Sequence, residues 1–147
     1  MRHKTYFIDT SALFKRYVKE TGTDAMDKLF ATGATRFICA ITPVEVISNL
    51  RRLVDLDRLI TEKEFQLLKG VFLQDISANR LEIVELAPSL LVSSLELCAD
   101  QYITPLDALQ LASALNMREH PVFVCADKKL LQRAAEKGLK IMDPTAS

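Results

Sequence analysis

Short apolar runs alternate along the chain with longer segments of helical periodicity. The short runs are rich in residues that pack well in strands, and they predict strands at 5–9, 36–40, 81–86, 122–126 and 139–143. Apolar positions at helical spacing predict helices at 11–18, 23–32, 42–59, 62–79, 88–101, 105–117 and 128–137. Strands separated by helices are typical of a parallel sheet covered on both faces. We therefore expect an α/β fold, a single α/β/α domain over residues 1–147 with about five parallel strands.

Several helix starts carry local signals. Thr61 with Glu64 matches a capping box. The segments "TPVE", from Thr42, and "TPLD", from Thr104, share a pattern in which Thr caps a helix, Pro is its first residue and an acid its third. The helix at 105–117 is apolar nearly all round, which predicts that it is buried.

Composition narrows the class of protein. The 147 residues are 49% hydrophobic, which suits one globular domain with a full core. Lys and Arg together number 19, as do Asp and Glu, so the formal net charge is zero. This balance disfavours binding of nucleic acid through the overall charge of the protein. Binding through a local basic patch stays possible. The chain has no transmembrane-length apolar run, no signal-peptide layout and no C-x-x-C pair. We expect a cytoplasmic protein without a membrane partner.

Four acids occupy positions that can converge in space. Asp9 and Asp127 directly follow predicted strands, and Glu45 and Asp107 lie in the first turns of predicted helices. In open parallel sheets, binding sites form beyond the carboxyl ends of the strands. Each acid also has an ordinary explanation, because acids at helix starts cap backbone N–H groups and interact favourably with the helix dipole.

Convergence of the four acids would require a counter-ion. Two carboxylates about 4 Å apart repel by roughly 4 kcal/mol at an effective dielectric constant of 20. A hard divalent cation removes that cost, and Mg²⁺ prefers oxygen ligands. The chain has only two histidines and three cysteines, which disfavours zinc. The acids therefore favour a site for a hard divalent cation such as Mg²⁺.

Four segments carry a family resemblance, in the order "FIDTSAL", "TPVEV", "LDALQLASAL" and "VCADKKLLQRAAEKGLKIMDP". Over nearly the whole chain they resemble the acidic motifs of PIN-domain ribonucleases, most closely the VapC-type toxins of bacterial toxin–antitoxin pairs. The resemblance implies strand order 3-2-1-4-5 and Mg²⁺- or Mn²⁺-dependent cleavage of RNA. It also implies a cognate small DNA-binding antitoxin and a homodimer.

The resemblance also assigns site residues. By motif, the catalytic and metal-binding acids are Asp9, Glu45, Asp107 and Asp127, with Ser11 as a polar residue near the metal. One departure is that many relatives carry an Arg shortly before the third acid, where this chain reads "DQYITPLDA".

Metal-assisted hydrolysis of a phosphodiester suits these residue types, because a bound metal lowers the pKa of its water and clamps phosphate oxygens. Asp9 and Asp107 are expected to bind the metal directly. Glu45 and Asp127 are expected to act through water or to orient the nucleophile. Basic residues near the acids are expected to contact the RNA backbone; these are Lys15, Arg16, Arg51, Arg52 and Lys128.

Other functions stay open at this point. Haloacid-dehalogenase-like phosphatases also place a nucleophilic Asp after the first strand, but they usually carry a second Asp two residues on, where this chain has Ser11. A phospho-accepting signalling domain has a similar alternation, but it does not need Glu45 and Asp107. A non-catalytic PIN-like protein that binds RNA or a protein partner would have the same sequence features.

Overall fold

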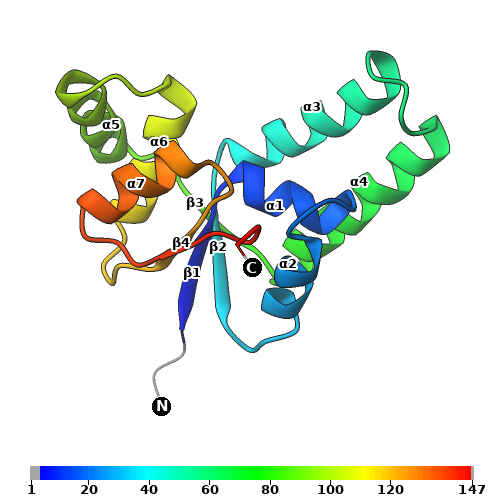
Figure 1. Cartoon of the computed structure of the whole chain (residues 1–147), viewed down its shortest axis with the longest axis horizontal. Coiled ribbons are helices and arrows are strands. Elements are labelled where there is room, and N and C mark those ends of the chain that lie inside the picture. The colour runs from blue at the N-terminus through cyan, green and yellow to red at the C-terminus, as the bar shows by residue number, and fades with distance from the viewer. Residues whose placement is uncertain (1–3, 147) are drawn as a thin grey trace.

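Five parallel strands form the central layer of the structure (Figure 1), a computed structural model that describes residues 4–146. The strands within these residues are β1 (Thr5–Ile8), β2 (Thr35–Cys39), β3 (Glu82–Val84), β4 (Val122–Val124) and β5 (Ile141–Met142). The helices are α1 (Thr10–Tyr17), α2 (Thr23–Phe30), α3 (Thr42–Asp55), α4 (Glu62–Ser77), α5 (Pro88–Asp100), α6 (Pro105–Leu115) and α7 (Lys128–Glu136). The predicted α/β alternation is confirmed. Most elements are shorter than predicted, most clearly α3, which ends at Asp55.

The strand order is β3-β2-β1-β4-β5, and every pairing is parallel, as predicted. The chain builds outward from β1 to β2 and β3, and then returns to place β4 on the other side of β1. The order therefore reverses between β1 and β4, where Phe7 pairs with Phe123. This reversal creates the switch point at which open parallel sheets bind ligands.

Both faces of the sheet are buried. Ile8, Ile38 and Val124 point into a core covered by α1, α2, α3 and α4. Their neighbours Phe7, Cys39 and Phe123 point into a second core, under α5, α6 and α7 (Figure 1). Successive residues of a strand point to opposite faces of the sheet. Because helices cover both faces here, the strands are expected to be apolar on both sides.

Two predicted helix caps are confirmed and a third is wrong. Thr61 and Glu64 form the capping box of α4, and the Thr104 hydroxyl accepts a hydrogen bond from the backbone N–H of Asp107. Thr42, by contrast, lies inside α3, which begins after Ile41 with no side-chain cap. The Thr42 hydroxyl instead bonds to Gln110 of the buried helix α6, so a tertiary contact has replaced the local one.

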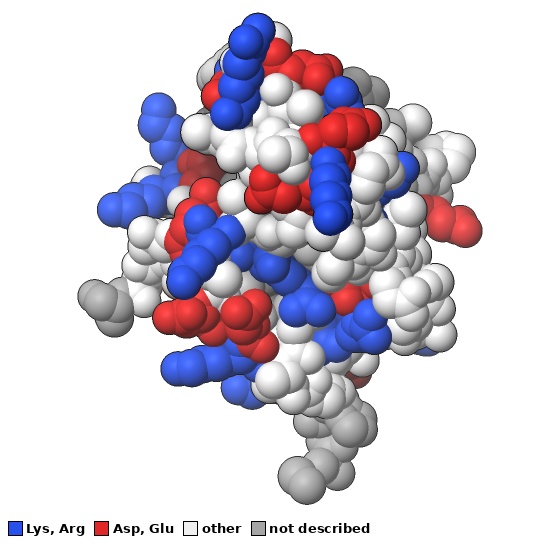
Figure 2. Space-filling view, turned by 90° about the vertical axis from the view of Figure 1, so that its right-hand side faces the viewer, with Lys and Arg blue, Asp and Glu red and all other residues white. Residues whose placement is uncertain are grey.

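Positive and negative side chains are interspersed on the face that Figure 2 draws, and neither sign dominates there. This distribution agrees with the balance of 19 basic and 19 acidic residues. Across residues 4–146, no helix combines the length and apolar character needed to cross a membrane.

Asp75 of α4 is the centre of a buried polar network. Its carboxylate is 0% exposed and accepts hydrogen bonds from Arg16 (2.8 and 3.0 Å), Tyr17 (2.7 Å) and Arg80 (2.6 Å). Burial by itself would raise the pKa of Asp75, but these hydrogen bonds outweigh burial and hold the pKa below its usual range. The network fixes the end of α1 to α4 and to the segment that leads into β3.

Asp75→Ala is expected to lower the free energy of unfolding by about 3 kcal/mol, because it leaves the buried Tyr17 hydroxyl and two partly exposed guanidinium groups without their acceptor. Asp55→Ala, which breaks the exposed ion pair with Arg51, should leave stability nearly unchanged. Urea denaturation of both variants measures the difference. Equal, small effects in the two variants would contradict the central role of Asp75.

Candidate active site

A cavity of about 190 Å³ opens at the carboxyl ends of β1 and β4. Its lining residues include all four predicted acids and the predicted serine, namely Asp9, Ser11, Glu45, Asp107 and Asp127. Asp9 directly follows β1, and Asp127 follows β4 by a short turn. Glu45 and Asp107 lie in the first turns of α3 and α6. Four elements far apart in sequence thus contribute one acid each to a single cavity.

Asp9 is almost completely buried, at 4% exposure. Its carboxylate caps α1 by accepting from the backbone N–H of Ala12, and it also accepts from the Ser11 hydroxyl (2.8 Å) and the Cys125 thiol (3.3 Å). Burial raises the pKa of Asp9 to about 6 despite these hydrogen bonds, and the charge of Asp107 adds to the rise. Asp9 is therefore both a helix cap and a member of the acidic cavity.

Asp107 faces other carboxylates of the cavity, and their charges act on it. Burial raises the pKa of Asp107, the hydrogen bond with Thr104 opposes this, and the carboxylates of Asp127 and Glu45 raise it further. Asp127 is exposed at the rim, where it caps α7 by accepting from the backbone N–H of Lys129 and Leu130. The cavity thus holds like charges whose ionisation is mutually unfavourable.

A buried polar layer lies beneath Glu45 and was missed by the sequence analysis. The Thr10 hydroxyl donates to Glu45 (2.8 Å), and the Gln110 amide nitrogen lies 3.2 Å from the same Glu45 oxygen. The Gln110 nitrogen also contacts the hydroxyls of Thr10 (3.0 Å) and Thr42 (2.9 Å). These bonds fix the direction of Glu45. One signal was available, since Gln110 is a long polar residue in a helix predicted to be buried.

The five basic residues predicted to bind RNA do not line the acidic cavity. Four of them contact acidic residues of this chain; the partners are Glu20 for Lys15, Asp75 for Arg16, Asp55 and Glu62 for Arg51, and Asp57 for Arg52. Within residues 4–146, Lys128 is exposed and forms no ion pair. Arg51 and Arg52 extend along α3 beyond the cavity and interact with the α3–α4 hairpin.

The donor set of the cavity fits a hydrated hard cation. Its acidic side chains offer oxygen atoms, which Mg²⁺ and Mn²⁺ prefer over nitrogen or sulfur. In the part of the chain that the structure describes, no three His, Cys, Asp or Glu side chains stand close enough to hold one ion directly. Mg²⁺ usually keeps several of its waters, and a cavity of about 190 Å³ has room for a few of them at about 30 Å³ each.

The comparisons with known proteins concern the family and the fold. The PIN domain family matches residues 6–137, and the chain belongs to this family. The resemblance noted in the motifs is thereby confirmed at the level of the family. No curated protein matches the sequence significantly.

Solved structures share the fold. A toxin–antitoxin complex from Klebsiella pneumoniae aligns with a TM-score of 0.66 at 17% identity, covering 95% of this chain and 97% of that chain. VapBC2 from Rickettsia felis, bound to a DNA fragment from the promoter, aligns at 0.66 and 19% identity, covering 95% and 98%. PAE2754 from Pyrobaculum aerophilum aligns at 0.66 and 21%, covering 96% and 84%. At these identities the likeness concerns the fold.

The buried Asp9 predicts how stability varies with pH in the presence of a chelator. Its pKa is raised from 3.8 to about 6 in the folded state, so the folded protein binds more protons than the unfolded chain between these values. The contribution of Asp9 to the free energy of unfolding should fall by about 3 kcal/mol as the pH rises from about 4 to above 6, and should stay reduced at higher pH.

Asp9→Asn keeps a residue that caps helices well and removes the titrating group. The difference in stability between the variant and the parent protein should therefore grow in favour of the variant across this pH window. Urea denaturation at several pH values measures it, and all other carboxylates are common to both proteins. A difference that does not change with pH would contradict the raised pKa of Asp9.

Proposed function

We propose that the protein is a Mg²⁺- or Mn²⁺-dependent endoribonuclease that acts as the toxin of a VapBC-like toxin–antitoxin pair. The observation that carries the proposal is the convergence of Asp9, Glu45, Asp107 and Asp127 on one cavity at the switch point of a PIN-domain sheet. Burial and mutual charge raise the pKa of Asp9 and Asp107. A cavity that keeps such groups together is suited to a divalent cation.

The chain's own residues divide the work around that cation. When bound, the metal supplies a water of lowered pKa and neutralises charge on the phosphate. Asp9 and Asp107 would hold it, and Ser11 orients Asp9 by a hydrogen bond to its carboxylate. Glu45, fixed by Thr10 and Gln110, and Asp127, exposed at the rim, would bind through water or orient the attacking nucleophile.

The surroundings of Asp9 disfavour a phosphotransfer enzyme with a covalent aspartyl intermediate. Ser11 stands where haloacid-dehalogenase-like phosphatases usually carry a second Asp, and its hydroxyl donates to both carboxylate oxygens of Asp9. The acids Glu45 and Asp107, which such a mechanism does not need, line the same cavity. A non-catalytic protein that binds RNA or a partner stays the alternative, and turnover distinguishes it from the nuclease.

Cleavage of single-stranded or loop RNA should require Mg²⁺ or Mn²⁺ and stop in chelator. Asp9→Asn and Asp107→Asn should each lower the rate by about 100-fold or more, because each removes a ligand charge from the reacting centre. Asp55→Asn makes the same charge change on the exposed side of α3 and should retain the parental rate. Gel analysis of end-labelled RNA measures all four proteins. Parental rates in both cavity variants would contradict the assignment.

Thermal melts provide a control that does not depend on turnover. Metal that binds only the folded protein stabilises it by about 2.7 kcal/mol at 100 times its Kd. Mn²⁺ should raise the melting temperature of the parent protein more than that of Asp107→Asn. Metal stabilisation without RNA cleavage would favour the non-catalytic alternative.

Exposed apolar side chains support two protein contacts within the proposal. On α5, Leu91, Val92 and Leu95 are exposed, and on α4 Leu67 and Val71 are exposed. Contiguous exposed apolar surface marks interaction sites. We assign the α5 surface to a homodimer. The α4 surface is assigned to the cognate small DNA-binding antitoxin, in line with the toxin–antitoxin complexes that share the fold.

Light scattering at high protein concentration should give the mass of a dimer, and Leu95→Glu should convert it to a monomer by placing a charge in the seam. Leu67→Glu makes the same change on α4 and should leave the dimer intact. Monomeric parent protein would exclude the α5 seam, and dissociation by the α4 variant alone would move the seam to α4.

A further inference from the structure

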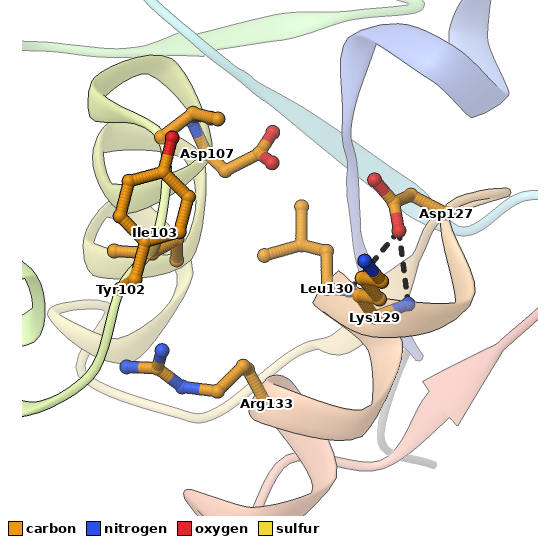
Figure 3. A pocket seen from close by; sticks show the side chains of 8 residues that line it. Tyr102, Ile103, Asp107, Asp127, Lys129, Leu130 and Arg133 are labelled. Atoms are coloured by element: carbon orange, nitrogen blue, oxygen red, sulfur yellow. Dashed lines mark hydrogen bonds between the residues drawn. The ribbon is translucent and has the colours of Figure 1, made fainter.

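A second cavity adjoins the acidic one and has different chemistry. It measures about 220 Å³ and lies between the segment that leads into α6 and the first turns of α7 (Figure 3). Its lining includes Tyr102, Ile103, Leu130 and Arg133. Asp107 and Asp127 line both cavities, so a group bound in the second lies directly beside whatever occupies the first.

We infer that this second cavity is a nucleobase subsite, which receives one unstacked base of single-stranded RNA next to the scissile phosphate. The inference rests on the proposed function, because it names the substrate group that lies beside the acidic cavity. Tyr102 would stack on the base, Ile103 and Leu130 would contact it from inside the cavity, and Arg133 and Lys129 would contact a flanking phosphate.

Tyr102 is the first observation that supports a base. The side chain is 90% exposed at the rim of the cavity, although tyrosine rings usually bury much of their surface. A ring presented in this way offers a flat face beside an apolar cavity. A base stacked on an aromatic side chain gains about 5- to 150-fold in affinity, independently of the base's identity.

The charges around the cavity are the second observation. Within residues 4–146, neither Arg133 nor Lys129 forms an ion pair, in contrast to four of the basic residues that the sequence suggested. The Arg133 guanidinium makes only long contacts, of 3.4 Å, with the carbonyl oxygens of Leu97 and Gln101. Figure 3 shows the Arg133 side chain extending from α7 toward the side of the cavity where Tyr102 lies, away from Asp127. Cationic side chains without an ion-pair partner, at the edge of an acidic site, suit a phosphate.

Size and shape restrict the occupant further. A volume of about 220 Å³ is below the range of about 300–1,000 Å³ that encloses drug-sized ligands, so the cavity suits a single ring system. A base enters such a space only if it is unstacked and unpaired, which is the state of bases in loops and single strands. The cavity would therefore select single-stranded RNA and position the neighbouring phosphodiester at the acids.

The test is a double-mutant cycle between protein and RNA. The substrates are a short single-stranded RNA that the parent protein cuts and a copy with an abasic nucleotide beside the cut. Tyr102→Ala should lower kcat/KM on the intact RNA by about 10- to 100-fold, and Tyr102→Phe should retain it within about 3-fold. The parent protein should lose the same factor on the abasic RNA, and Tyr102→Ala should lose little more there.

Arg133→Ala should weaken RNA binding and reduce the slope of log affinity against log salt concentration by about 1, as expected for one lost phosphate contact. Arg118→Ala is the matched control, because Arg118 is exposed beyond the opposite end of α6. Parental slopes in both variants would overturn the phosphate contact. Equal kcat/KM of Tyr102→Ala and the parent protein on both RNAs would overturn the subsite, even if cleavage itself is observed.

A binding measurement tests the subsite independently of the proposed nuclease function. If the parent protein cuts no RNA, fluorescence anisotropy of the labelled RNA reports the subsite by itself: weaker binding by Tyr102→Ala than by Tyr102→Phe supports it, and equal binding overturns it. If Tyr102→Ala changes nothing with RNA but weakens a complex with an antitoxin, the cavity binds protein and the inference is overturned.

Discussion

A carboxylate buried at the end of β1 is the constraint around which the site is organised. Asp9 is 4% exposed, and an ionised carboxylate loses much of its hydration at such a position. Three kinds of donor compensate in part, namely the N–H at the start of α1, the Ser11 hydroxyl and the Cys125 thiol. Their compensation is incomplete, since the pKa of Asp9 stays near 6. A cation in the cavity would offset the part of the lost hydration energy that these donors do not replace.

The same helix that Asp9 caps is fixed at its other end by the Asp75 network. Arg16 and Tyr17, in the last turn of α1, both donate to the buried carboxylate of Asp75. The Asp9 carboxylate therefore fixes the start of α1 at the carboxyl end of β1, and the Asp75 carboxylate fixes its last turn against α4. On the proposed function Asp9 would need placement within about 0.5 Å. The distant Asp75 thus contributes to the position of Asp9 without belonging to the cavity.

Much of the fold and the set of acids could be predicted from the sequence, because both depend on local patterns. Strand and helix periodicity gave the alternation, and acids at strand ends and helix starts gave Asp9, Glu45, Asp107 and Asp127. The hydrogen-bond pairs between side chains far apart in sequence could not be predicted from local patterns. Arg16 bonds to Asp75, which lies 59 positions away, and Thr42 bonds to Gln110, 68 positions away. No local pattern encodes those pairs, which form only when α1 meets α4 and α3 meets α6.

The balance of charge explains how a neutral protein with an acidic cavity would bind a polyanion. The acids alone would repel the phosphates of RNA, and most cations near them are already paired with carboxylates of this chain. On the proposed function, attraction would come from two local sources, namely the cation in the acidic cavity and the side chains of Lys129 and Arg133 beside it, which form no ion pair within residues 4–146. Because the cation would offset part of the negative charge that RNA meets, metal and RNA would bind cooperatively on the proposed function, and each would raise the affinity of the other by the same factor. The raised pKa values of Asp9 and Asp107 show that ionisation of these two acids is unfavourable in the cavity, and a bound cation would lower that cost.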